Sequence, residues 1–208
     1  SNGSSDSSGK TSTNGESEEA NNKQYKLETN GVLTSTIDIN WTQIKNDVEK
    51  IYTLIYPMTI DLYQTKTNQE DIVNFNKEFD SLTKSAKDEN KENYLLELAK
   101  LYDYLPKFIE NCTNDQSKNV VIKTKNNIFK AYSILDKEDW NKISSNINDA
   151  SQEFTKLITN VNQNKSVNHY NVNKAYVIIN ELQNAINLKD KEVFLIKYKN
   201  LLEELENI

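Results

Sequence analysis

Residues 41–62, WTQIKNDVEKIYTLIYPMTIDL, carry the pattern that decides the fold. Their apolar side chains recur every three or four residues, a spacing that places them on one face of an α-helix. The members of this stripe are Trp41, Ile44, Val48, Ile51, Ile55, Met58 and Leu62. Asp38 and Asn40 stand where capping oxygens are needed before the first turn. The stripe keeps its register through Pro57, so we expect one long helix with a proline kink.

The same spacing continues along the chain and predicts six more helices. Their ranges are about 71–88, 91–109, 117–135, 140–161, 171–188 and 191–205. Pro106 again falls inside an apolar stripe that stays in phase. The alternative at both prolines is a helix start, with Tyr56 or Leu105 ending the preceding segment. All four glycines lie in the first 31 residues, and no alternating pattern marks a strand. The sequence therefore predicts an all-α bundle of about six or seven antiparallel helices.

An internal match indicates two duplicated three-helix units. At an offset of one hundred, the stripe Ile72, Phe75, Phe79, Leu82, Ala86 faces Val172, Ala175, Ile179, Leu182, Ile186. Trp41 and Trp140 match at an offset of ninety-nine, and we expect them to be equivalent core anchors. The predicted repeats are 38–112 and 137–208, joined by a connecting helix at 117–135. The alternative is that amphipathic helices always align at some register.

The N-terminal segment differs sharply from the rest of the chain. Residues 1–24 contain no Leu, Ile, Val, Phe, Trp, Tyr or Met, and Ser, Gly, Asn, Thr and Glu dominate. A segment of this composition cannot offset the entropy lost on ordering. We therefore predict a disordered tether over residues 1–36 and a helical-bundle domain over residues 37–208.

Residues 1–16, SNGSSDSSGKTSTNGE, resemble the spacer that follows the lipidated cysteine in lipoproteins of low-GC Gram-positive bacteria such as clostridia. The resemblance is compositional and covers only this tail. It implies an extracytoplasmic protein anchored to the outer face of the cell membrane by a lipid anchor preceding Ser1. Composition alone also allows a cytosolic protein with a flexible arm, or a cloning remnant at Ser1 and Asn2.

The charged residues argue against a nucleic-acid partner. All 25 basic residues are lysine, asparagine occurs 31 times, and the net charge is −6. This lysine and asparagine usage is typical of an AT-rich genome. Without arginine the chain has no bidentate fork for phosphate or guanine, and its negative charge opposes a polyanion.

The residues needed for common cofactor and metal sites are missing from the sequence. Without glycine after residue 31, the chain has no Walker loop, dinucleotide fingerprint or nucleophile elbow. One cysteine and one histidine cannot form a Cys/His zinc set, so no cofactor or metal is expected. We expect Cys112 to be a small buried residue at a helix end and His169 to be solvated. Asp136, Glu138 and Asp139 are interpreted as capping and solvating groups.

Tyrosine gives the strongest indication of binding. One group near the first proline contains Tyr52, Tyr56 and Tyr63, and another near the second contains Tyr94, Tyr102 and Tyr104. Their spacing predicts a tyrosine-lined groove near the two kinks, since tyrosine presents a rigid amphipathic surface that suits recognition. The alternative is that these side chains cover the core edge and keep their hydroxyls in water.

These observations favour a non-catalytic, membrane-tethered binding module for a partner protein, a cell-wall glycan or a small ligand. An alternative is a glycan-active enzyme with paired carboxylates across a cleft. Another is a cytosolic adaptor that packs partner helices through exposed apolar residues such as Val177, Ile178 and Leu202.

Overall fold

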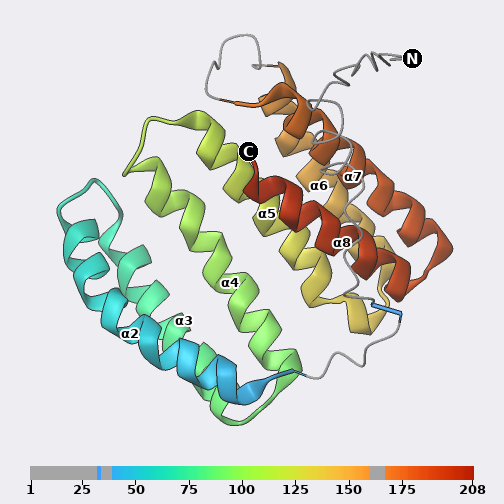
Figure 1. The fold of residues 1–208 in the computed structure, drawn as a ribbon. Helices are drawn as coiled ribbons and strands as arrows, with labels where there is room; N and C mark the ends of the chain where they lie inside the picture. Colours follow the sequence, from blue (N-terminus) through green and yellow to red (C-terminus); the bar gives the residue numbers. More distant parts are fainter. Residues whose placement is uncertain (1–31, 34–38, 160–166) are drawn as a thin grey trace, which may run out of the picture. The chain divides into compact units, whose positions relative to one another are not determined.

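The computed structural model describes residues 32–33, 39–159 and 167–208, and within these ranges the chain is all-α. Seven α-helices and one short 3-10 helix, η1, follow one another with no strand among them (Figure 1). Their bounds are α2 Trp41–Tyr63, α3 Gln69–Lys87, α4 Lys91–Glu110, α5 Gln116–Ser133, η1 Leu135–Lys137, α6 Trp140–Thr159, α7 His169–Leu188 and α8 Lys191–Glu206. The predicted helical bundle is confirmed, and the predicted ranges end at most two residues from these bounds.

The helices belong to one compact unit, Thr36–Ile208, and the chain before them forms a separate unit, Ser1–Ser35. The predicted tether of residues 1–36 falls almost wholly outside the described residues and stays a prediction. Among the helices that the structure describes, none is long and apolar enough to cross a membrane.

Each of the seven helices starts after an asparagine or aspartate that accepts a hydrogen bond from a backbone N–H of the first turn. These residues are Asn40, Asn68, Asn90, Asp115, Asp139, Asn168 and Asp190. A cap of this kind satisfies donors that the helix itself leaves without a partner, at about 1 kcal/mol each. The capping expected of Asn40 and Asp139 is confirmed, whereas Asp38 lies outside the described residues.

Both prolines lie inside helices. Helix α2 runs through Pro57, and α4 runs through Pro106. The expectation that the apolar stripes continue past the prolines is confirmed, and the alternative that each proline starts a helix is wrong. Pro57 is exposed and Pro106 is buried.

Consecutive helices pack on each other in chain order, and α5 additionally contacts α8 (Figure 1). Two apolar clusters result, one built by α2, α3 and α4 and the other mainly by α5 to α8. A series of ring contacts runs from α4 through α5 to α8: Tyr102 to Phe129 at 5.0 Å, Phe129 to Tyr132 at 5.9 Å and Tyr132 to Tyr198 at 4.7 Å. Through these rings α5 connects the two clusters.

The hairpins α3–α4 and α7–α8 correspond at an offset of one hundred residues. The degree of burial agrees at every position between residues 67–89 and residues 167–189. In each hairpin the turn residue, Glu89 or Lys189, has a left-handed backbone with φ of 53° or 54°. The next residue, Asn90 or Asp190, donates its N–H to the carbonyl five residues earlier and then caps the following helix. This is a Schellman arrangement without the usual glycine.

Helices α2 and α6 correspond at an offset of ninety-nine. Both start at a half-buried tryptophan, Trp41 or Trp140. Tyr52 of α2 donates a hydrogen bond to Asp80 of α3, and Ser151 of α6 donates one to Asn180 of α7. The two three-helix units therefore share their caps, the turn between their last two helices and one interhelical hydrogen bond. Because both tryptophans are half-buried, they are less deeply buried anchors than the sequence indicated.

Candidate functional site

The outer surface of α2 presents an unusual concentration of exposed large apolar side chains. Tyr56 is 68% exposed, Ile60 is 60% exposed and Tyr63 is 44% exposed. They follow Tyr52 at intervals of four, eight and eleven residues, so the four side chains lie on one side of the helix. We call these four residues the tyrosine face. Exposed apolar patches of this kind mark interaction sites in soluble proteins.

Tyr52 anchors the tyrosine face to α3. Its hydroxyl donates to Asp80 Oδ1 at 2.9 Å and lies 2.8 Å from Thr83 Oγ1. Its ring meets Phe79 edge-on, with 4.8 Å between the ring centroids. Burial is the main cause that raises the pKa of Tyr52. Tyr52 therefore has a structural role, and Tyr56 and Tyr63 are the tyrosines of this group that stand free of the core.

The corresponding side of α6 is polar. At the positions of Tyr52, Tyr56 and Ile60, helix α6 carries Ser151, Thr155 and Thr159. Since α6 packs on α7 as α2 packs on α3, packing within the unit does not require large side chains at the second and third of these positions. The tyrosine face is therefore a property of α2 alone.

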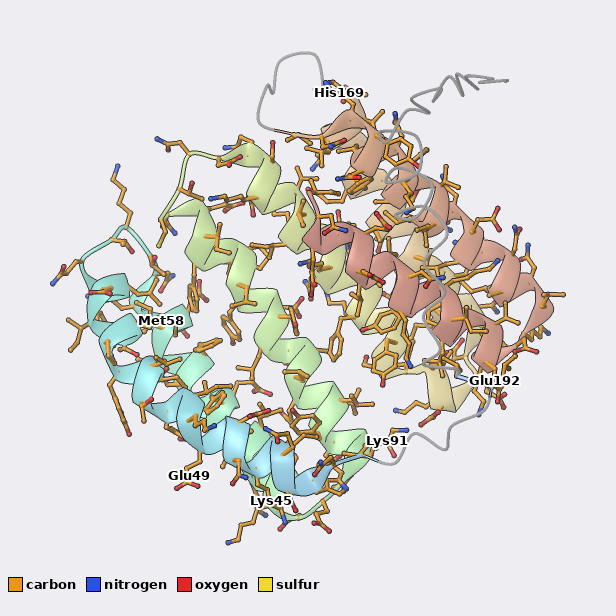
Figure 2. The ribbon with its side chains drawn as sticks, viewed as in Figure 1. Lys45, Glu49, Met58, Lys91, His169 and Glu192 are labelled. Carbon is orange, nitrogen blue, oxygen red and sulfur yellow. The ribbon has the colours of Figure 1, made fainter. Side chains whose placement is uncertain are left out.

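A shallow hollow of about 300 Å³ adjoins Tyr52 between α2 and α3. Its polar lining comes from Lys45, Glu49, Thr83 and Lys87, with Val48 and Ala86 at its base. Lys45 and Glu49 project from the same side of α2 (Figure 2). Lys45 also forms an ion pair of 3.0 Å with Glu89. The tyrosine face thus ends in a polar, charged margin, as interaction surfaces commonly do.

The second predicted tyrosine group is not part of this surface. Tyr94 meets Trp41 edge-on at 5.7 Å, and burial is the main cause that raises its pKa. Tyr102 packs on Phe129 of α5. Tyr104 packs on Phe75 and Phe108, and the Lys107 ammonium lies 5.5 Å from the centre of its ring. These three side chains contact three different parts of the fold.

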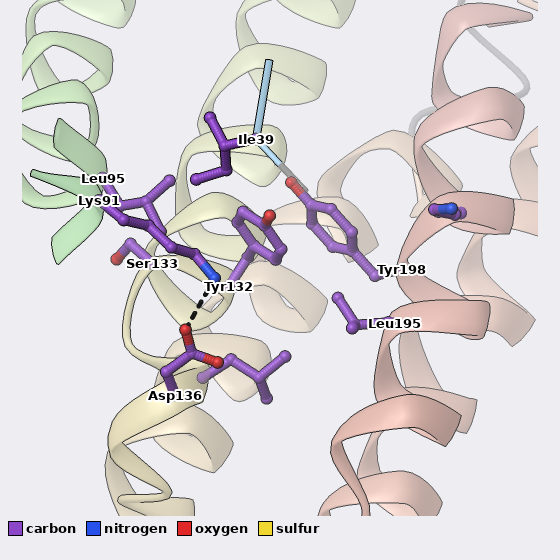
Figure 3. Close-up of a pocket in the computed structure, with 10 residues that line it drawn as sticks. Ile39, Lys91, Leu95, Tyr132, Ser133, Asp136, Leu195 and Tyr198 are labelled. Atoms are coloured by element: carbon purple, nitrogen blue, oxygen red, sulfur yellow. Dashed lines mark hydrogen bonds and ion pairs between the residues drawn. The ribbon is translucent and has the colours of Figure 1, made fainter. Parts of the chain in front are cut away.

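A second hollow, which the sequence did not indicate, lies between α4, α5, η1 and α8 (Figure 3). Its volume is about 310 Å³. Tyr132 and Tyr198 stack at 4.7 Å along one wall, and burial raises the pKa of Tyr198 strongly. At the opening, Lys91 donates to Asp136 Oδ2 at 2.9 Å. Tyr132 and Tyr198 are 66 positions apart in the sequence, and they meet because α5 packs against α8.

The carboxylates show no catalytic pairing around these hollows. Each hollow has one lining carboxylate, Glu49 in the first and Asp136 in the second, whereas a glycosidase of the paired type needs two. Asp136 is held by Lys91, and Asp139 caps α6. Within the ranges that the structure describes, no cluster of three or more His, Cys, Asp or Glu side chains is suited to hold a metal ion.

The structure also shows the positions of five other residues that the sequence singled out. Cys112 is exposed in the turn after α4, so the expectation of a buried cysteine is wrong. The physical reason is that α4 ends at Glu110, which leaves Cys112 beyond the apolar stripe in a loop. His169 is the exposed first residue of α7 (Figure 2). Of the adaptor candidates, Val177 is 58% exposed, while Ile178 and Leu202 pack partly against the larger cluster.

Comparison of the chain with protein-family models, with curated proteins and with solved structures finds no match.

Proposed function

We propose that the protein is a non-catalytic binding module that contacts a partner protein through the tyrosine face of α2. The observation that carries this proposal is a difference between two corresponding helices. Helix α6 carries Ser151, Thr155 and Thr159. At the same positions α2 carries Tyr52, Tyr56 and Ile60. Tyr56 and Ile60 are more than half exposed, so the fold gains little from them. Tyrosine beside an aliphatic side chain is a composition enriched in protein interfaces.

A protein partner suits this surface better than a glycan. Recognition of a sugar needs polar side chains that are free to bind its hydroxyls. Two polar groups beside Tyr52, those of Asp80 and Thr83, already form hydrogen bonds with that tyrosine, and Lys45 forms an ion pair with Glu89. The exposed residues further along the face, Tyr56, Ile60 and Tyr63, offer mainly apolar area.

The composition of residues 1–24 supports a place for this module on the outer face of the cell membrane, carried by a flexible tether and a lipid anchor preceding Ser1. The genomic reading frame upstream of Ser1 tests this part. An apolar signal segment that ends in a cysteine is expected there, and a start codon immediately before Ser1 would contradict the proposal.

The binding test compares a double variant, Tyr56→Thr with Ile60→Thr, with the natural chain. These substitutions give α2 the residues of α6. The control is Val177→Thr, which removes a similarly exposed apolar side chain from α7. Cell-envelope proteins and purified wall glycan from the source organism are offered separately to each immobilised chain. We expect binding of an envelope protein that the double variant weakens about tenfold or more and the control leaves unchanged. Equal binding by all three chains, or binding of glycan alone, would refute the proposal.

A further inference from the structure

The two three-helix units differ in what covers them. In the second unit α5 packs along α6 and also contacts α8. Three side chains of α6 spaced seven residues apart are buried, Ile143 and Ala150 at 0% exposure and Leu157 at 2%. On α8, the side chains Phe194, Tyr198 and Leu205 are buried as well. Helix α5 therefore acts as the fourth helix of this unit.

In the first unit α5 packs on α4, but among the described residues no helix packs along α2 as α5 does along α6. The counterparts on α2 are Ile44, Ile51 and Met58, and none of them is buried, with Ile51 at 40% exposure. The counterparts on α4 are Tyr94, Leu98 and Leu105, and these are also only partly buried. All six have apolar or aromatic side chains, five of them partly buried against the cluster that α2, α3 and α4 share. We call these six residues the open face.

A second line of residues on α2 runs beside the open face. Asp47, Leu54 and Asp61 are spaced seven apart, so they lie along one line of the helix, next to the line of Ile44, Ile51 and Met58. Leu54 is 66% exposed. Asp47 lies close enough to α4 to contribute, after burial, to the raised pKa of Tyr94. Neither aspartate forms an ion pair within the part of the chain that the structure describes.

The open face and the tyrosine face are separate surfaces. Ile51 and Ile60 are nine residues apart, which is two and a half helical turns, so their side chains leave α2 in opposite directions. A ligand on one face therefore leaves the other accessible, and substitutions on the two faces can be tested independently.

We propose that the open face binds an amphipathic helix of a partner protein that carries lysine along its edge, in the position that α5 takes on α6. The open face supplies the apolar seam, and Asp47 and Asp61 supply the charge that selects lysine. Helix α5 shows what such a helix looks like. It has 18 residues, four lysines and no acidic residue, and it buries Ile128 and Ala131 completely.

A second copy of the chain suits the open face less well. A two-fold contact through α2 would bring the Asp47 and Asp61 side chains of both copies to one seam, and like charges at a seam oppose association. A lysine-bearing helix meets no such repulsion. The binding mode is the helix-in-groove type, with anchors that repeat every three or four residues.

The test uses a synthetic peptide of residues 115–134 as the probe and the full chain as the receptor. Binding is followed by fluorescence anisotropy of the labelled peptide at low salt, up to about 1 mM receptor. We expect saturable binding that Leu54→Glu weakens about tenfold or more and that a double variant, Asp47→Lys with Asp61→Lys, weakens likewise. A peptide with its four lysines changed to glutamate should not bind. Val177→Glu, on α7, is the matched receptor control and should bind like the natural chain.

Folding of each receptor variant is checked by circular dichroism, and because Leu54 is exposed we expect unchanged helicity. No binding at any concentration would overturn the proposal. So would binding that Leu54→Glu leaves intact, or sedimentation that shows the natural chain to be a dimer sensitive to the same substitution. Loss of peptide binding in the variant with Tyr56→Thr and Ile60→Thr would also overturn it, because the peptide would then occupy the tyrosine face.

Discussion

Removing the hydroxyl of Tyr52 should lower the free energy of unfolding by about 1 kcal/mol. This hydroxyl lies 2.9 Å from Asp80 Oδ1 and 2.8 Å from Thr83 Oγ1. Each hydrogen bond contributes about 0.5–1.5 kcal/mol net, and the low end of that range applies because the hydroxyl is partly exposed. Two such bonds together contribute about 1 kcal/mol. The ring contact with Phe79 survives in Tyr52→Phe, so only the hydrogen bonds are lost.

Tyr52→Ser extends the test, because it installs the residue that α6 carries at this position. It also loses the edge-on ring contact, which contributes about 0.5–1.5 kcal/mol, so the total cost should reach about 1.5–2.5 kcal/mol. Tyr56→Ser is the matched control, and at 68% exposure it should change stability by less than about 0.5 kcal/mol. Urea unfolding followed by circular dichroism measures all three. A neutral Tyr52→Phe together with a destabilising Tyr56→Ser would show that the roles of the two tyrosines are reversed.

Three further substitutions test the turns, the buried tyrosine and the proline. Lys189→Gly should stabilise the fold by about 0.5–1 kcal/mol in thermal or urea unfolding, because glycine adopts the left-handed backbone of this position without strain; a loss of stability would contradict this. Burial raises the pKa of Tyr198 above its unfolded value near 10. The contribution of the neutral Tyr198 side chain to the stability of the fold is therefore complete below about pH 10 and is lost as pH rises through the folded pKa. Tyr198→Phe should therefore reduce the fall in the free energy of unfolding above about pH 10. An unchanged fall would refute the assignment of this pH dependence to Tyr198. Pro57→Ala should raise the free energy of unfolding by about 1–3 kcal/mol, since alanine restores an N–H to the carbonyl of Thr53; a neutral result would mean that the helix has already adapted to the proline.

The helices could be predicted closely because their signals are local. The apolar spacing within each segment fixes a helix, and an asparagine or aspartate before it supplies the cap. Pro57 shows the same rule, since an unbroken stripe on both sides outweighed the usual helix-breaking effect of proline. The chain also matches itself at an offset of one hundred, and the turns at Glu89 and Lys189 then prove to share one geometry.

The site could be predicted only in part, because exposure depends on neighbouring helices rather than on spacing. All six chosen tyrosines have similar local surroundings in the sequence, yet Tyr56 faces solvent whereas Tyr104 packs on Phe75 and Phe108. The stacked pair of Tyr132 and Tyr198 has no local signal at all, since α5 and α8 meet only through the tertiary packing.

The two three-helix units, set side by side, distinguish residues that the fold needs from residues that it does not. Positions where both units agree, such as the caps at Asn90 and Asp190, are required by the shared geometry. At two exposed positions α2 carries a large apolar side chain where α6 has a polar one: Tyr56 in place of Thr155, and Leu54 in place of Glu153. Exposed apolar area lowers solubility and contributes little to folding, so its presence on one helix of a corresponding pair needs a cause outside the unit. The binding that we propose on both sides of α2 would supply that cause.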